Sequence, residues 1–181
     1  MDRLFCLSFI NDISTLQCDL WVSTLKKIAI FVDVQNIYYT TRQAYGRQFN
    51  YRALWKKINS QGDVVSATAY AIHRGDDKQH KFQSALRYMG FTVKLKPFIQ
   101  RSDGSAKGDW DVGIAIDVMG IAKDVDVIVL LSGDGDFDLL LDKVRKDYNV
   151  TAEVYGVPSL TANSLVDAAS IFHPIDDELL L

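Results

Sequence analysis

Short apolar runs alternate along the chain with segments in which apolar residues recur every three or four positions. The apolar runs predict strands at 27–32, 64–72, 91–95, 125–131 and 150–155, with a short last strand at 171–172. Helical spacing predicts helices over 37–45, 51–60, 77–89, 109–121, 136–145 and 162–169. Strands that alternate with helices indicate an α/β fold, in which a mostly parallel sheet is covered by helices on both faces. In such sheets ligands bind beyond the carboxyl ends of the strands, where the strand order reverses.

The helix over 109–121 is expected to turn Val112, Ile116 and Met119 towards the core, because this spacing places them close together on one face. The helix over 77–89 shows the same spacing at Phe82, Leu86 and Met89, and Gly90 follows as its stop signal. These faces predict how the helices pack on the sheet.

The main domain is expected over residues 26–174, with residues 175–181 as a C-terminal tail. Residues 1–25 contain a broad apolar stripe, which predicts either an extra helix packed on the domain or an extension outside the core fold. Polar residues interrupt that stripe, which argues against a signal peptide.

The composition predicts a protein without a membrane segment. No apolar run approaches the roughly 20 residues that a membrane span needs. The two cysteines, Cys6 and Cys18, form no CxxC pair and have no histidine nearby, so they indicate neither a zinc site nor a disulfide framework. A cytoplasmic location is therefore expected.

The charges are distributed unevenly along the chain. Residues 42–107 hold 13 Lys and Arg against 4 Asp and Glu, whereas residues 108–181 hold 4 against 15. A basic segment beside an acidic one suits a protein that grips an anion with one part and holds metal with the other. Two solvated faces of opposite sign would give the same pattern, so charge alone does not decide between these interpretations.

Acidic side chains follow two of the predicted buried strands directly. Asp33 and Asn36 come after the strand at 27–32, and the sequence SGDGDFD (132–138) comes after the strand at 125–131. If the two strands are neighbours, Asp33 and Asp134 should face each other. Several carboxylates in one place repel unless a cation lies among them, and hard oxygen ligands suit Mg²⁺ or Mn²⁺. Taken singly, each acid could instead cap a helix or a turn.

A third acidic group, Asp109 and Asp111, begins the predicted helix over 109–121. As acids in the first turn of a helix, both would be stabilised by the helix dipole. In the functional interpretation, Asp111 instead joins Asp33 and Asp134 in one acidic cluster. Asp117 lies six residues further on, about 240° around a helix, so Asp111 and Asp117 cannot both point into one site.

Three segments together resemble a known family: FVDVQNIYY (31–39), KGDWDVGIAIDVM (107–119) and VIVLLSGDGDF (127–137). In this order and spacing they look like the NYN domain, in the LabA-like branch of the PIN-like nucleases. The resemblance covers roughly residues 26–174. It implies a Rossmann-like, three-layer α/β/α sandwich, an acidic cluster that binds Mg²⁺ or Mn²⁺, and ribonuclease activity.

The resemblance also implies roles for individual residues. Asp33, Asp111, Asp134 and Asp136 match the catalytic, metal-binding acids. Supporting roles are implied for Asn36, Ser132, Asp109, Asp117 and Asp138. The candidate contacts to the RNA backbone are Lys107, Arg42, Arg47, Arg74, Lys78 and Arg101. Family members often have one residue between the Lys-Gly pair and the acid; here two intervene, so Asp109 is a rival to Asp111 as the ligand.

These expectations describe a metal-dependent ribonuclease that hydrolyses phosphodiester bonds of RNA. A second possibility is a regulator that binds RNA or a protein partner and has little or no activity; a homodimer is also conceivable. A phosphatase is a third reading, because an Asp after a buried strand can accept a phosphoryl group. It is weakened by Gln35, which stands where the haloacid-dehalogenase-type phosphatases have a second Asp.

Overall fold

The protein is described by a computed structural model that covers residues 25–73, 77–97, 99–100, 106–107 and 109–181. Six parallel strands form the central sheet in the order β3-β2-β1-β6-β7-β8. Their bounds are Lys27–Asp33 (β1), Asp63–His73 (β2), Thr92–Pro97 (β3), Val127–Leu131 (β6), Thr151–Gly156 (β7) and Ile171–Pro174 (β8). Their order reverses between β1 and β6, the arrangement of Rossmann-type sheets.

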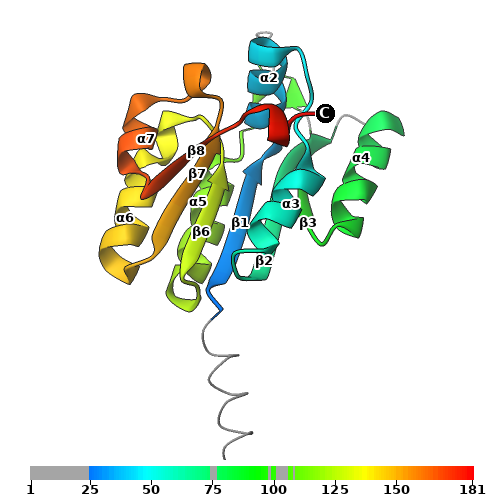
Figure 1. Ribbon diagram of the computed structural model, residues 1–181. Coiled ribbons are helices and arrows are strands. Elements are labelled where there is room, and N and C mark those ends of the chain that lie inside the picture. The colour runs from blue at the N-terminus through cyan, green and yellow to red at the C-terminus, as the bar shows by residue number, and fades with distance from the viewer. Residues whose placement is uncertain (1–24, 74–76, 98, 101–105, 108) are drawn as a thin grey trace, which may run out of the picture.

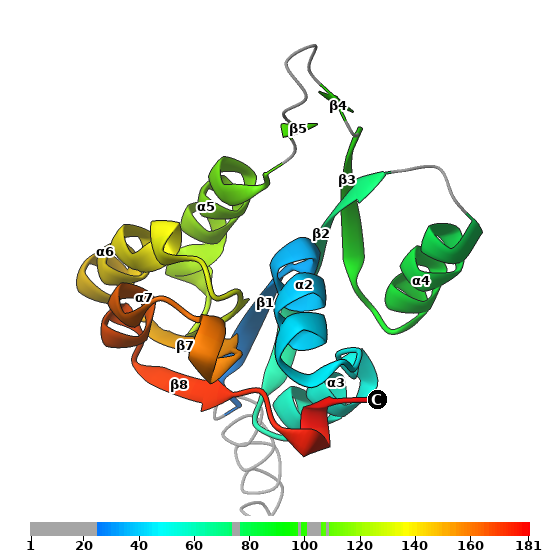
Figure 2. The ribbon, with the colours of Figure 1, turned by 90° about the horizontal axis from the view of Figure 1, so that it is seen from above.

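Helices cover both faces of the sheet, which confirms the predicted α/β/α sandwich (Figure 1, Figure 2). The helices α2 (Val34–Tyr45), α3 (Tyr51–Asn59) and α4 (Asp77–Tyr88) pack on one face, and α5 (Asp111–Ile121), α6 (Asp138–Tyr148) and α7 (Asn163–Ala168) on the other. Strands β1 and β6 are buried on both sides, and this is why their sequences are continuous apolar runs.

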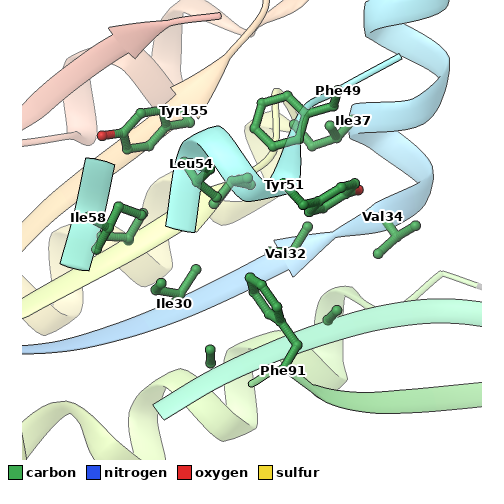
Figure 3. Close-up of a cluster of buried hydrophobic side chains, with 14 of the residues drawn as sticks. Ile30, Val32, Val34, Ile37, Phe49, Tyr51, Leu54, Ile58, Phe91 and Tyr155 are labelled. Carbon is green, nitrogen blue, oxygen red and sulfur yellow. The ribbon is translucent and has the colours of Figure 1, made fainter. Parts of the chain in front are cut away.

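The core on the first face is built from alternate residues of β1 and the apolar stripe of α3. Ile30 and Val32 project from β1 towards Leu54 and Ile58 of α3, with Phe91 beside them (Figure 3). All five side chains are almost completely buried. Since successive strand residues point to opposite faces, Ala29 and Phe31 belong to the second core.

The predicted orientation of α5 is wrong. Ile114 and Val118 are fully buried, whereas Val112 and Ile116 are 69% and 66% exposed and Met119 is only partly buried. Apolar residues occur on every side of this helix, so their spacing did not single out one face.

The sequence analysis also missed a small antiparallel hairpin between β3 and α5. Its strands are β4 (Ile99–Gln100) and β5 (Ala106–Lys107). Two-residue strands carry too little pattern for a prediction. The hairpin lies on the route by which the chain crosses from the edge strand β3 to α5 (Figure 2).

The last seven residues do not form a free tail. Leu179 and Leu180 are buried, the backbone N–H of Asn50 donates to the carbonyl of Leu179 over 2.7 Å, and Leu180 forms a bridge with Phe49. This segment therefore closes the core beside α3. The expectation for the N-terminal segment falls on residues 1–24, which lie outside the described residues. None of the helices in the described part of the chain is long and apolar enough to cross a membrane.

Candidate metal centre

The two predicted acidic strand ends meet at the centre of the sheet. β1 and β6 pair in register up to Val32 and Leu131, so the chain leaves both strands at the same level. Asp33 ends β1, and Ser132 begins the loop that carries Asp134. This is the point of strand-order reversal at which α/β sheets bind ligands.

Asp33 both caps α2 and belongs to the electrostatic environment of the acidic site. One carboxylate oxygen, Oδ1, accepts hydrogen bonds from the backbone N–H groups of Gln35 and Asn36, each over 3.1 Å. Burial nevertheless raises the pKa of Asp33, and the nearby charges of Asp134 and Asp109 raise it further. Asp33 therefore does cap a helix, as one interpretation of the sequence expected. Its second carboxylate oxygen, Oδ2, accepts no hydrogen bond from the described residues.

The loop after β6 is held in a defined shape by short-range hydrogen bonds. The hydroxyl of Ser132 accepts from the backbone N–H of Asp134 over 3.2 Å, and Oδ1 of Asp134 accepts from that of Asp136 over 3.0 Å. The amide oxygen of Asn36 accepts from the backbone N–H of Gly133 over 2.9 Å. A Cβ at Gly133 would lie 2.7 Å from the carbonyl oxygen of Leu160, so close packing of backbone requires glycine there.

Three carboxylates come together at this point. One carboxylate oxygen each from Asp111, Asp134 and Asp136 lies within 4.8 Å of the others. Desolvation by burial raises the pKa of Asp111 to about 6, and the charges of Asp109, Asp134, Asp33 and Asp136 add to the shift. Uncompensated carboxylates at this spacing destabilise one another, and a divalent cation with hard oxygen ligands would relieve that repulsion. The donor set therefore fits Mg²⁺ or Mn²⁺.

Four of the predicted acidic residues, Asp33, Asp109, Asp117 and Asp138, lie outside this triad. Asp109 is exposed, and its charge raises the pKa of Asp111. Asp138 is the first residue of α6, and Asp33 contributes through its charge. Of the two rival acids before α5, the structure thus brings Asp111 and not Asp109 into the triad.

Trp110 anchors the first turn of α5 and thereby places Asp111. Its indole N–H donates to the carbonyl of Ala71 on β2 over 2.9 Å, and its ring lies 5.2 Å from that of Tyr70. Lys96 of β3 sits 4.4 Å from the centre of the Trp110 ring and donates to the carbonyl of Asp109 over 2.7 Å. Trp110 is thus held in place by contacts with Ala71, Tyr70 and Lys96.

Asp117 belongs to a separate polar network, about one and two-thirds turns further along α5 than Asp111. One of its carboxylate oxygens accepts from the hydroxyl of Tyr70 and from the ammonium group of Lys94, each over 2.5 Å. Burial and this carboxylate raise the pKa of Tyr70. Asp117 lies outside the triad, as the angle between positions 111 and 117 required.

The lysines of β3 were missed as positioning residues. Lys94 and Lys96 alternate along the strand, so they share one face of the sheet, and both contact residues of α5 or its N-terminal flank. The alternation in the sequence TVKLKP was the available signal, because residues two positions apart point to the same face of a strand.

Comparison with known proteins identifies the family of this fold. A family model described as the NYN domain matches residues 27–176. The chain belongs to the NYN domain family. It is 29% identical over 160 residues to the low amplitude and bright protein LabA of Synechococcus elongatus, an alignment that covers 83% of this chain and 84% of LabA. This similarity supports the LabA-like branch of the NYN proteins.

A solved structure shows the same fold in a relative. A crystal structure of a Vibrio parahaemolyticus protein of unknown function has a TM-score of 0.83 and 55% identity, covering 87% of this chain and 97% of that one. The NYN family lies within the PIN-like nuclease superfamily.

The predicted cationic contacts of the NYN domain separate into different environments. Arg42 and Lys78 line a groove between α2 and α4. Arg47 instead donates to the carbonyls of Leu181 and Leu180 and pairs with Asp177. Lys107 lies in β5. Arg74 and Arg101 fall outside the described residues.

Proposed function

We propose that the protein is a ribonuclease that depends on Mg²⁺ or Mn²⁺ and hydrolyses phosphodiester bonds of RNA. The main support for this proposal is the triad of Asp111, Asp134 and Asp136, which lies where the strand order of an NYN fold reverses. The carboxylate of Asp117, in a separate network, has a hydroxyl and an ammonium partner within the protein, whereas burial and the charges of neighbouring acids, Asp134 and Asp136 among them, raise the pKa of Asp111.

In this proposal the triad carboxylates hold the ion, and Asp33 contributes a fourth carboxylate through Oδ2, the oxygen that caps no backbone N–H. When bound, the ion supplies Lewis-acid activation of water and neutralises charge at the scissile phosphate. Hydrolysis forms a bond between the water oxygen and phosphorus and breaks the bond to the leaving ribose oxygen, which takes up a proton.

In this proposal the remaining residues of the site hold the metal-binding acids in position. Asn36 and Ser132 hold the backbone of the loop that carries Asp134, through bonds to the N–H groups of Gly133 and Asp134. Trp110 and Lys96 hold the first turn of α5. Because a displacement of about 1 Å can cost on the order of 100-fold in rate, these supports matter for activity.

The test is cleavage of a labelled single-stranded RNA with Mn²⁺, with Mg²⁺ and with EDTA. The Asp134→Asn variant should lose activity while its unfolding midpoint stays the same or rises, since one of the repelling charges is removed. Asp167→Asn on α7, an exposed acid, is the matched control and should cleave like the wild type.

Two results would replace this proposal. RNA that binds but is not cleaved with either metal would identify a regulatory RNA-binding protein that keeps the acidic triad. Hydrolysis of small phosphomonoesters without cleavage of RNA would identify a phosphatase. Unfolding of Asp134→Asn would show that Asp134 serves the fold and not a dedicated metal site.

A further inference from the structure

A groove of about 770 Å³ opens on the sheet face that α2 and α4 cover. Its α2 wall starts at Val34 and Gln35, the residues that follow Asp33, and continues to Arg42. Its α4 wall includes Lys78 and Gln83. The volume lies within the range of small-molecule sites. The groove therefore begins at the residues that follow Asp33 and includes two of the predicted cationic residues, Arg42 and Lys78.

Gln83 is the unusual residue in this groove. It is only 2% exposed, yet its side-chain amide makes no hydrogen bond with any of the residues that the structure describes. A buried amide without a partner costs free energy, and such groups in native proteins call for an explanation. Among the described residues only the hydroxyl of Tyr155 is both unpartnered and sealed from solvent, so the amide of Gln83 remains open to the groove. A ligand in the groove can supply its missing partners.

Aromatic and cationic side chains form the rest of the binding surface. Tyr38 and Tyr39 are 45% and 51% exposed, and their rings lie edge to face 5.3 Å apart. The guanidinium group of Arg42 lies 5.6 Å from the centre of the Tyr38 ring and donates to its hydroxyl over 3.2 Å. Lys78 adds a second positive charge on the α4 side, and Asp77 is the one acid among the described residues that line the groove. The groove thus combines flat apolar surface with an excess of positive charge.

These features select one kind of occupant. A purely apolar ligand would leave Gln83 unpaired, and a free phosphate would not use the tyrosines. A nucleobase offers a flat face for stacking and adjacent donor and acceptor atoms along its edge, which a glutamine amide can pair with in a bidentate manner. Its flanking phosphates would lie near Arg42 and Lys78.

We propose that this groove binds a nucleobase of the RNA strand that approaches the acidic cluster, with Gln83 pairing with the base edge and Arg42 and Lys78 contacting flanking phosphates. The proposal rests on the function proposed above, because it names a subsite for the same substrate. It assigns α2 two roles: its first residue follows Asp33 at the metal centre, and its exposed face holds the strand.

The test measures RNA binding in EDTA, so that it does not depend on cleavage. A short labelled single-stranded RNA is titrated with the wild type and with Gln83→Leu, Tyr38→Leu and the control Gln43→Leu, which changes an exposed glutamine of α2 outside the groove. We expect Gln83→Leu and Tyr38→Leu to raise the Kd about tenfold, and Gln43→Leu to leave it unchanged. Nucleoside monophosphates should compete with the RNA, and ribose 5-phosphate should not.

Stability separates a ligand role of Gln83 from a structural one. If its amide has no partner in the free protein, Gln83→Leu should unfold at the same or a higher urea concentration than the wild type. A marked loss of stability, an unchanged Kd, or equal competition by ribose 5-phosphate would overturn the groove proposal.

The outcomes for cleavage and for binding are independent. Metal-dependent cleavage by the wild type together with an unchanged Kd and KM in Gln83→Leu would reject the groove and keep the nuclease. Absence of cleavage together with base-dependent binding lost in Gln83→Leu would reject the nuclease and keep the groove as a site for RNA.

Discussion

The amide oxygen of Asn36 accepts a hydrogen bond of 2.9 Å from the backbone N–H of Gly133, across 97 positions of the chain. This bond joins the first turn of α2 to the loop that follows β6. Asp33 caps that turn, and Asp134 is the next residue of that loop. Asn36 therefore fixes the distance between the two acidic strand ends without belonging to the triad itself.

Replacing Asn36 by Ala should destabilise the fold and weaken the site together. Gly133 is buried, so its N–H would lose its partner, at a cost of about 1–3 kcal/mol in the free energy of unfolding. Urea unfolding checks the stability, and Mn²⁺ titration checks the site. Gln43→Ala, an exposed change in the same helix, should alter neither. Equal effects of both substitutions would argue against a role for the hydrogen bond.

Asp111 and Asp117 should differ sharply in their effect on metal binding. Asp111→Asn removes a triad carboxylate and should weaken Mn²⁺ binding at least about tenfold. Asp117→Asn should leave the Mn²⁺ affinity within about threefold, because its carboxylate contacts Tyr70 and Lys94. Isothermal titration of both variants measures this difference. A larger loss in Asp117→Asn would place the metal site at Asp117, about one and two-thirds turns further along α5.

Arg47 should serve stability, in contrast to Arg42. Arg47→Ala removes two bonds to carbonyls at the C-terminus and should lower the free energy of unfolding by about 1 kcal/mol, without weakening RNA binding. Its ion pair adds little, since the side chain of Asp177 is 94% exposed. Arg42→Ala should show the reverse pattern. Weaker RNA binding by Arg47→Ala would instead return Arg47 to the substrate path expected from the sequence.

The sheet and its acidic edge were both predictable from the same feature of the sequence, apolar runs that are followed by acids. Strands buried on two faces need continuous apolar runs, and Asp33 and Asp134 interrupt such runs at their ends. The family resemblance then predicted the fold, and the strand order confirmed that these ends are adjacent. The separation between Asp111 and Asp117 followed from helix geometry alone.

Other features depend on contacts between distant segments, which local patterns do not contain. The face of α5 is decided by Trp110, which docks on β2 through the carbonyl of Ala71. Gly113 permits this docking, since a Cβ there would lie 2.7 Å from the Trp110 ring. Gln83 appears as an ordinary polar residue of α4 until its burial beneath the groove is known.

The acidic site should give the metal-free protein a stability that depends on pH. Burial, with the charges of Asp109 and Asp134, raises the pKa of Asp111 from 3.8 to about 6 in the folded protein. Its value in the unfolded chain stays near the ordinary one. The folded state therefore binds this proton more tightly, and the resulting stability is full below about pH 4 and is lost as the pH rises through 6.

The last prediction is that Mn²⁺ reverses this loss. In EDTA, the free energy of unfolding of the wild type should fall between about pH 4 and pH 7 by on the order of 1 kcal/mol, a figure reduced because Asp111 is partly exposed to solvent. Asp111→Asn should flatten this slope but not remove it, because burial also raises the pKa of Asp33. Saturating Mn²⁺ should raise stability most at neutral pH, where the carboxylates are ionised and protons no longer compete for them. Urea unfolding across this pH range, with and without Mn²⁺, measures all three effects. A stability that rises with pH in EDTA would mean that the triad acids are already neutralised by the protein, and a metal would then have no repulsion to relieve.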